Sequence, residues 1–337
     1  MRRRRLACGI ATAAAVAAAA LSAHAGVVPR PPGQVAIFYY PWYGTPQRDG
    51  GWQHWTQHGA QPPGLVASGW YPSRGAYSSS DPKVLRAQMR EIAAAGVDTV
   101  IVSWWGPGSA EAARLPLVSS FARAAGLGVA VHIEPYGGRT PGALEPELRR
   151  LAAEGITDFY IYDSTIQADE DWKALNERLD GVRLFANTGL PGKALKGGFD
   201  GLYTYDVLIF DGFSFPRVCA SARTLGLVCA PSVGPGYDAR RATGDTRVQP
   251  RLDGARYDRM WRAAVRAQAD VVTITSYNEW HEGTQIEPAR AAQPSYASYA
   301  GAWGAVGARA ERAYLMRTAL WAERYRRQTA RSQPARQ

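Results

Sequence analysis

Short runs of β-branched and aromatic residues recur along the chain, and most are followed by a longer segment with apolar residues at helical spacing. This alternation predicts strand and helix units that build a parallel sheet. Strands are expected at residues 35–40, 97–103, 128–133, 158–162, 183–186, 201–204, 227–231 and 271–276. The pattern therefore predicts one α/β domain, a single (β/α)8 barrel of the TIM type.

The first predicted helix has clear ends. Asp81 can cap it, Pro82 suits its first position, and Gly96 favours its end. Further helices are expected up to about residue 125, at 145–154, 169–179, around 193, and at 217–225, 257–269 and 308–327. An open, doubly wound sheet is the structural alternative. It is disfavoured because Tyr40-Pro41-Trp42 stands where that fold carries a glycine-rich phosphate turn.

The N-terminal residues 1–25 resemble a secretory signal peptide. Four arginines precede an alanine-rich apolar segment, and Ala23-His24-Ala25 is a small-x-small cleavage site, so we expect cleavage after Ala25. A retained membrane anchor is disfavoured because the apolar segment is short and poor in Leu, Ile and Phe. We expect a catalytic domain over residues 26–327, a disordered basic tail over 328–337, and a monomer that is secreted or periplasmic.

Charge and cysteine content narrow the possible partners. The formal charge of +10 falls to about +6 without the four N-terminal arginines, and the excess is spread over several helices. Nucleic-acid binding is not expected, because it favours a concentrated basic stripe and the positive charge here is spread out. No membrane partner is expected after cleavage of the signal peptide. Cys219 and Cys229 could form a disulfide in an oxidising compartment or remain free thiols. No zinc-ligand spacing is present, so we expect no metal and no cofactor.

Aromatic residues point to a carbohydrate ligand. The chain has 11 Trp and 17 Tyr, and many follow predicted strands instead of lying within helices. Exposed aromatic rings stack on the apolar faces of sugars, although aromatic residues also contribute to core burial.

The predicted barrel gathers polar and aromatic residues at the C-terminal ends of its strands, where active sites lie in this fold. Each of these residues could instead serve packing, but their shared position favours one site. The set comprises Tyr39, Tyr40, Trp42, Trp104, Trp105, His132, Glu134, Tyr136, Asp163, Asn187, Tyr205, Asp206, Asn278, Glu279, His281 and Glu282.

Two glutamates after the last strand are the candidate catalytic pair. In a continuing strand, Glu279 and Glu282 would lie on opposite faces about 10 Å apart. If the chain turns at Trp280-His281, as Gly283 suggests, their Cβ atoms would lie about 5 to 6 Å apart on one side. Carboxylates at that separation suit cleavage of a glycosidic bond, although solvated surface glutamates are the alternative.

Four motifs in the chain resemble those of glycoside hydrolase family 99, the endo-α-mannosidases and bacterial endo-α-mannanases. They are Phe38-Tyr-Tyr-Pro-Trp-Tyr-Gly44, Ser103-Trp-Trp-Gly106, His132-Ile-Glu-Pro-Tyr136 and Asn278-Glu-Trp-His-Glu-Gly-Thr-Gln-Ile-Glu287. The resemblance spans about residues 35–288 and implies a (β/α)8 barrel. It also implies retaining, endo-acting cleavage of α-mannosidic bonds through a 1,2-anhydro sugar, with a mannan or glycan as partner.

The resemblance assigns roles to individual residues. It makes Glu279 the base that assists the 2-hydroxyl of the sugar, and Glu282 the general acid and base. The other residues that it implies for substrate binding include Tyr205, which would bond to the carboxylate pair. His132 and Glu134 would bind sugar hydroxyls, and Tyr40 and Trp105 would contact ring faces. Trp42, Tyr136, Asn278 and His281 complete the expected substrate-binding set.

Burial beside Trp280 and nearby carboxylates should raise the pKa of Glu282. The connection from the first to the third strand is short for the family, which leaves the linkage and the preferred chain length undetermined. The alternatives are an α-glucan hydrolase on a related barrel and a non-catalytic carbohydrate-binding protein. A metal-dependent hydrolase that uses His281 and Glu282 lacks further ligands at suitable spacing.

Overall fold

A computed structural model describes residues 33–291 and 293–332, and its main sheet is a closed parallel barrel in the order β1-β10-β7-β6-β5-β4-β3-β2. The barrel strands are β1 (Gln34–Tyr39), β2 (Thr99–Trp104), β3 (Gly128–Ile133), β4 (Asp158–Ile161), β5 (Arg183–Asn187), β6 (Gly201–Thr204), β7 (Val228–Val233) and β10 (Val271–Ile274). The predicted (β/α)8 barrel is confirmed. Its last strand ends at Ile274, before the predicted Ser276, because the chain turns there toward the candidate carboxylates.

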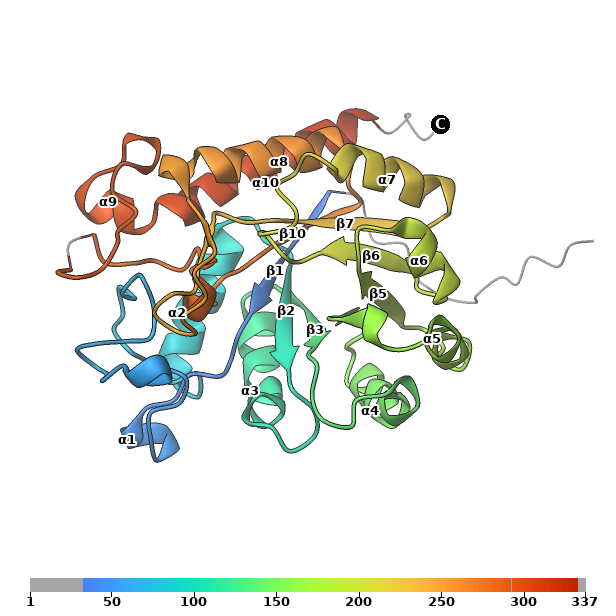
Figure 1. Cartoon of the computed structure of the whole chain (residues 1–337), viewed down its shortest axis with the longest axis horizontal. Coiled ribbons are helices and arrows are strands. Elements are labelled where there is room, and N and C mark those ends of the chain that lie inside the picture. Colours follow the sequence, from blue (N-terminus) through green and yellow to red (C-terminus); the bar gives the residue numbers. More distant parts are fainter. Residues whose placement is uncertain (1–32, 292, 333–337) are drawn as a thin grey trace, which may run out of the picture.

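Helices surround the strands, as Figure 1 shows. They are α2 (Pro82–Ala94), α3 (Ala110–Ala124), α4 (Pro141–Ala153), α5 (Asp169–Asn176), α6 (Pro191–Lys196), α7 (Phe215–Thr224), α8 (Ala255–Arg266) and α10 (Ala313–Ser332). The loops add α1 (Pro46–Asp49), α9 (Gly307–Glu311), the hairpin β8 (Tyr237–Asp238) with β9 (Val248–Gln249), and the 3-10 turns η1 (Gln57–Gly59), η2 (Ser164–Ile166), η3 (Leu252–Gly254), η4 (Trp280–Glu282) and η5 (Ala302–Gly304).

Aromatic side chains fill the barrel interior below the candidate site. The ring of Phe38 lies 4.7 Å from that of His132, 4.9 Å from that of Tyr205 and 5.7 Å from that of Tyr203, centroid to centroid. These residues come from β1, β3 and the end of β6, and they are buried. The packed interior gives the site a rigid floor.

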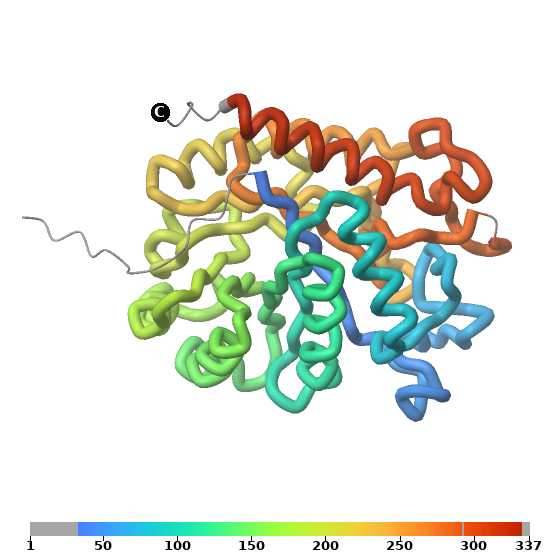
Figure 2. The backbone as a smooth tube through the Cα atoms, turned by 180° about the vertical axis from the view of Figure 1, so that it is seen from behind, coloured from blue at the N-terminus to red at the C-terminus, as the bar shows by residue number. Residues whose placement is uncertain are grey.

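The long connection from β1 to α2 forms one wall of the site. It lies beside residues 289–291 and 293–297, and Figures 1 and 2 both show these segments next to it. Isolated backbone bridges join Pro72 to Ala289 and Trp70 to Ala297. The helix that follows begins as predicted, because the side chain of Asp81 accepts a hydrogen bond from the backbone N–H of Lys83.

The C-terminal helix differs from its prediction in two ways. The predicted helix at 308–327 is divided into α9 and α10, and α10 continues to Ser332. Gln328, at the start of the expected disordered tail, donates from Nε2 to the backbone oxygen of Val265 on α8, so helical packing extends past residue 327. Residues 333–337 and the expected signal peptide lie outside the described residues.

The two cysteines left open by the sequence form a disulfide. Cys219 on α7 is bonded to Cys229 near the start of β7, with 5.2 Å between their Cα atoms. Among the described residues, no helix has the length and apolar character needed to cross a membrane. In the same part of the chain, no cluster of three or more His, Cys, Asp or Glu side chains is arranged to hold a metal ion.

Candidate active site

The two candidate glutamates lie on one tight turn, as the second of the two sequence alternatives requires. Glu279 precedes η4 and Glu282 ends it, and the backbone N–H of Glu279 donates to Ser276 Oγ at 2.9 Å. Gly283 follows with φ +63°, a left-handed conformation that favours glycine. A Cβ atom at position 283 would lie 2.7 Å from the ring of Trp70, so this position has no space for a side chain.

Glu279 is buried and lies at the end of a chain of hydrogen bonds from Tyr40 through Tyr205. Tyr205, just after β6, donates its hydroxyl to Glu279 Oε2. Since that hydroxyl is already a donor, Tyr40 must donate to the oxygen of Tyr205. Burial first, and the charge of Glu282 second, raise the pKa of Glu279 well above that of an ordinary carboxyl group, against the opposing effect of the Tyr205 hydrogen bond.

Glu282 is half-buried and lies closer to solvent than Glu279. Burial and the charges of Asp206 and Glu134 raise the pKa of Glu282 to about 8, while a hydrogen bond with Glu279 opposes the rise. Both carboxyl groups therefore resist ionisation, and neighbouring buried carboxylates do not ionise together easily. The pair is suited to hold one proton near neutral pH.

A second polar cluster at the end of β3 faces the same centre. His132 Nδ1 lies 2.9 Å from Glu134 Oε1, and His132 Nε2 lies 2.8 Å from the hydroxyl of Tyr203. Ser103 on β2 donates to the same oxygen of Glu134 at 2.8 Å. The ring of His132 stacks on that of Tyr205 at 5.3 Å, which brings this cluster next to the carboxylate pair.

Trp42 and His281 form an aromatic stack with His54, a residue that the sequence did not single out. The ring of Trp42 lies 4.6 Å from that of His54 and 5.5 Å from that of His281. His281 Nε2 donates to the backbone oxygen of His54 at 2.7 Å. Burial lowers the pKa of His281 to about 3, so this imidazole is neutral and holds the turn in place.

Asn278 is fully buried and joins the turn to the end of β1. Its Oδ1 accepts from the backbone N–H of Tyr40 at 2.7 Å, and its Nδ2 donates to the oxygen of Tyr40 at 2.9 Å. The side-chain groups of Asn278 are thus engaged within the protein. Together with His281, it fixes the turn that carries the two glutamates.

The remaining predicted residues at the strand ends have different surroundings. Trp105 is 36% exposed, whereas Trp104 is fully buried and packs edge-on against half-buried Tyr136 at 5.6 Å. Tyr39 turns away from the site, since its hydroxyl donates to Gln88 Oε1 on α2 at 2.6 Å. Of these residues, Trp105 offers the most exposed ring surface.

A cavity of about 460 Å³ lies at the ends of β4, β5 and β6. Asp206 lines this cavity, and its charge helps to raise the pKa of Glu282. The predicted residues Asp163 and Asn187 also line the cavity. The lining comprises Tyr162, Asp163, Thr165, Asn187, Thr188, Gly189, Leu190, Asp206, Ile209, Phe210, Ser214, Arg217 and Val218. The mixture of hydroxyl, amide, carboxylate and ring groups suits sugar hydroxyls and ring faces.

Sequence reasoning missed Tyr203 and Tyr162, although a signal was present. Tyr203 precedes Tyr205 by two positions, so the alternation of side chains along a strand places both on one face. Tyr162 follows β4, and the charges of Glu282 and Asp163 act on its hydroxyl. His54 had no such signal, because it lies in an irregular loop.

The chain is similar to known glycoside hydrolases in sequence and in structure. The profile of glycosyl hydrolase family 99 matches residues 33–327. A glycoprotein endo-alpha-1,2-mannosidase-like protein of Danio rerio is 32% identical over 316 residues, which cover 76% of this chain and 71% of that protein. The glycoprotein endo-alpha-1,2-mannosidase of Xenopus laevis is 31% identical over 367 residues, or 88% of this chain and 78% of that protein. The solved family 99 endo-alpha-mannosidase of Bacteroides thetaiotaomicron has a TM-score of 0.78 and 28% identity, covering 89% of this chain and 99% of that one.

Proposed function

Because the chain belongs to glycosyl hydrolase family 99 and is an endo-acting glycoside hydrolase, we propose that it cleaves internal α-mannosidic bonds with retention of configuration. We assign Glu279 as the base that assists the 2-hydroxyl and Glu282 as the general acid and base. The observation that carries this assignment is the placement of both carboxyl groups on one turn, in surroundings that favour a single proton between them.

In the first step, ionised Glu279 takes the proton of the 2-hydroxyl while O2 attacks the anomeric carbon. Protonated Glu282 gives its proton to the glycosidic oxygen, whose bond to that carbon breaks. The products are a 1,2-anhydro sugar and a free leaving group. The donated hydrogen bond from Tyr205 favours the ionised form of Glu279, which this step needs.

In the second step, Glu282 takes a proton from water, and the water oxygen attacks the anomeric carbon. The bond from that carbon to O2 breaks, and Glu279 returns its proton to O2. Two inversions give net retention, and the carboxyl pair holds one proton before and after each step. The axial 2-hydroxyl of mannose lies opposite an axial α leaving group, whereas the equatorial 2-hydroxyl of glucose does not, so the mechanism requires a manno-configured ring.

The surroundings of the pair suggest how a glycan lies across the barrel end. Glu282 must face the glycosidic oxygen, and Asp206 next to it lines the cavity of about 460 Å³. We assign this cavity to sugars on the leaving-group side. His132, Glu134 and Trp105 lie toward β2 and β3 and would hold the sugar that is attacked and its neighbour.

We also propose that the protein works outside the cytoplasm. The disulfide between Cys219 and Cys229 suits an oxidising compartment. The N-terminal pattern of arginines, an apolar segment and Ala23-His24-Ala25 suits export. Amino-terminal sequencing of the protein recovered from culture medium and from periplasm tests both points, and a protein that begins at Met1 would contradict export with cleavage.

The test of the catalytic proposal uses residues 26–337 with yeast α-mannan, beside Glu282→Gln and the exposed control Glu170→Gln. We expect oligosaccharide release by the parent and by the control, and a loss of about 10²- to 10⁴-fold in Glu282→Gln. Proton NMR of the first product should show the α-anomer. Release from an α-glucan instead of mannan would indicate the glucan hydrolase. Retention of mannan in an affinity gel without any cleavage would indicate a binding protein.

A further inference from the structure

A third glutamate lies beneath the catalytic turn and takes no part in the proposed chemistry. Glu287 has no solvent exposure, and each of its carboxylate oxygens accepts two hydrogen bonds. Oε1 accepts from Arg74 Nε at 2.7 Å and from Gln88 Nε2 at 2.8 Å. Oε2 accepts from the Tyr77 hydroxyl and from Trp280 Nε1, both at 2.8 Å.

Two of these donors connect Glu287 to the turn that carries the catalytic pair. Trp280 immediately follows Glu279, is fully buried, and directs its indole N–H at Glu287. Tyr77 accepts a hydrogen bond from Asn278 Nδ2 at 3.2 Å while it donates to Glu287. The carboxylate of Glu287 therefore accepts one hydrogen bond from the turn directly and is linked to Asn278 through the hydroxyl of Tyr77.

The other two donors connect Glu287 to the outer layer. Gln88 lies on α2, and Arg74 precedes this helix and also donates to Glu91 on it at 2.6 Å. Tyr277, two residues before Glu279, donates its hydroxyl to the same oxygen of Glu91 at 2.7 Å. The turn and α2 are thus joined through two carboxylates, buried Glu287 and half-buried Glu91.

Such a network contributes little to the free energy of folding for the number of polar groups that it buries. A buried ion pair often contributes less free energy of folding than well-packed apolar residues of the same volume. What it supplies is orientation, because each donor must keep one direction to avoid a buried, unpaired polar group. Trp280 has few alternatives, since its ring is enclosed and Glu287 is the acceptor of its N–H.

We propose that Glu287 is a positioning residue that fixes Trp280 and, through it, the separation of the Glu279 and Glu282 carboxyl groups. The inference rests on the proposed function, in which these two groups act on neighbouring atoms of one sugar. Glu287 touches neither the pair nor the substrate. Glu287 holds the short turn through the indole N–H of Trp280, whereas His281 holds it through the backbone of His54 and Asn278 through the backbone of Tyr40.

Two substitutions separate orientation from simple packing. Trp280→Phe keeps a buried ring but removes the N–H that Glu287 accepts. Glu287→Gln keeps the shape but places an NH₂ group against donors in either orientation, since all four partners donate. Trp280→Phe removes fewer contacts, so it carries the test if Glu287→Gln fails to fold.

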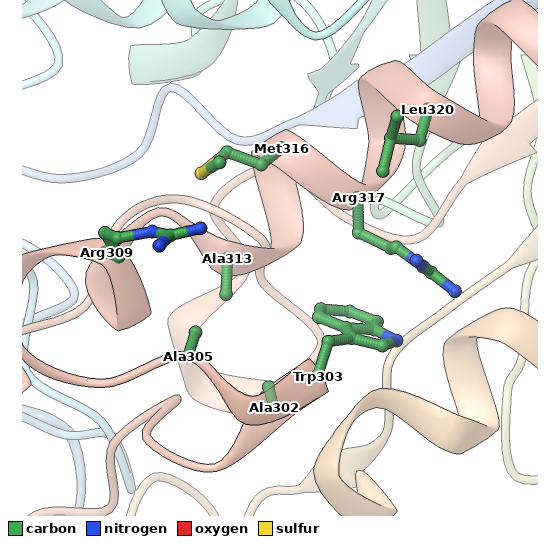
Figure 3. A pocket seen from close by; sticks show the side chains of 8 residues that line it. All are labelled: Ala302, Trp303, Ala305, Arg309, Ala313, Met316, Arg317 and Leu320. Carbon is green, nitrogen blue, oxygen red and sulfur yellow. The ribbon is translucent and has the colours of Figure 1, made fainter.

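Asp258 on α8 offers a matched control in the outer layer. It is a buried carboxylate that accepts from Arg317 Nε at 2.7 Å, Trp321 Nε1 at 2.7 Å and Trp303 Nε1 at 3.2 Å, so it shares with Glu287 an arginine and an indole donor. Figure 3 shows Trp303 and Arg317 at a cavity of about 170 Å³. That cavity is lined by Ala302, Trp303, Ala305, Arg309, Ala313, Met316, Arg317 and Leu320, none of which is a predicted site residue.

The experiment measures kcat, KM, pH profile and Tm for the parent, Trp280→Phe, Glu287→Gln and Asp258→Asn on an α-mannan oligosaccharide. We expect all three variants to have a lower Tm. Only the first two should lose kcat, by about 10- to 100-fold, with KM within about twofold of the parent and a shifted basic limb. Parental kcat and pH limbs in Trp280→Phe would overturn the proposal and leave Glu287 a structural residue.

Crystal structures of the parent and of Trp280→Phe provide a readout that needs no activity. We expect the carboxyl groups of Glu279 and Glu282 to move relative to each other in Trp280→Phe and to keep their places in Asp258→Asn. If the parent releases nothing from mannan, the proposed function fails, and the structures still decide the role of Glu287. Unmoved carboxyl groups in Trp280→Phe would overturn the inference whatever the substrate is.

Discussion

Glu279 and Glu282 differ in what surrounds their carboxyl groups. Burial and the charge of Glu282 raise the pKa of Glu279 well above that of an ordinary carboxyl group, while the hydrogen bond that Glu279 accepts from the hydroxyl of Tyr205 opposes this rise. Glu282 is more open to solvent and faces the charges of Asp206 and Glu134, which favour its protonated form. The pair therefore holds one proton, and the hydrogen bond from Tyr205 favours the ionised form at Glu279, as the first step of the proposed reaction requires.

The first prediction concerns the pH dependence of activity. Glu282 must be protonated to act as an acid, and its pKa is about 8, so kcat/KM should fall as pH rises through about 8. In Asp206→Asn the negative charge that helps to raise this pKa is gone, so the basic limb should move to lower pH. Initial rates between pH 5 and 9 provide the measurement. A limb that stays in place in Asp206→Asn would contradict the role of this charge.

The second prediction is that Glu282→Gln is more stable than the parent at neutral pH. A folded-state pKa near 8 lies above the ordinary carboxyl value of 4.5, so the folded state binds the proton more tightly than the unfolded state does. The parent should therefore lose stability as pH rises from about 4.5 to 8, and the glutamine variant should not share this loss. The gain in Tm should be small at pH 4 and larger at pH 8.

Thermal melts at several pH values check this, with the exposed Glu170→Gln as control. The control should show no gain that grows with pH. A Tm difference between Glu282→Gln and the parent that stays constant from pH 4 to 8 would mean that the carboxyl group of Glu282 is not strained by its surroundings.

At the scale of elements, α7 and β7 are joined by the disulfide at the end of the barrel opposite the site. Cys229 is the second residue of β7, whereas the site lies where the strands end. The third prediction is that replacing both cysteines by alanine lowers the free energy of unfolding by about 2 to 3 kcal/mol. The value of kcat at 25 °C should stay that of the parent. Denaturant titration and initial rates measure the two effects, and a loss of kcat without a loss of stability would contradict the assignment.

The strands were predictable because each has a local signal. The predicted ends of β3 and β6 match the observed ends, since a glycine starts each run, and Glu134 follows the first run and Tyr205-Asp206 the second. The start of α2 was equally local, in Asp81 and Pro82. The division between α9 and α10 was not predictable, because the apolar spacing continues through Arg312, where the helix breaks.

The candidate site divides in the same way. That the two glutamates share a turn could be expected from Gly283, and the resemblance to family 99 supplied their roles. The surroundings of Glu287 could not be expected, because its donors Arg74, Tyr77 and Gln88 lie about two hundred residues earlier in the chain. A single sequence contains no signal for which distant side chains meet.

At the scale of the whole molecule, the cavity that Asp206 lines should make the enzyme sensitive to the length of its substrate. The fourth prediction is that two further sugars on the leaving-group side raise kcat/KM, because the cavity of about 460 Å³ offers them polar and aromatic contacts. Arg217→Ala should remove about tenfold of kcat/KM for the longer substrate and little for the shorter one.

Arg223→Ala on the same helix is the matched control, because Arg223 bonds to the backbone of Ala267 and Gln268 away from the cavity. It should leave the preference for chain length unchanged. Rates on matched oligosaccharides of increasing length give the measurement. An equal effect of Arg217→Ala on short and long substrates would place the leaving group elsewhere.

The closure of the barrel between β1 and β10 determines when in its synthesis the protein can become an enzyme. β1 is synthesised first, yet one of its two neighbours in the barrel is the last barrel strand, β10. Tyr40 likewise forms its backbone hydrogen bond with Asn278, which lies 238 residues later in the chain. A growing chain therefore has an unpaired strand edge and no active centre until its final barrel strand arrives. The time at which mannan cleavage begins during refolding would then report when β1 and β10 pair and close the barrel.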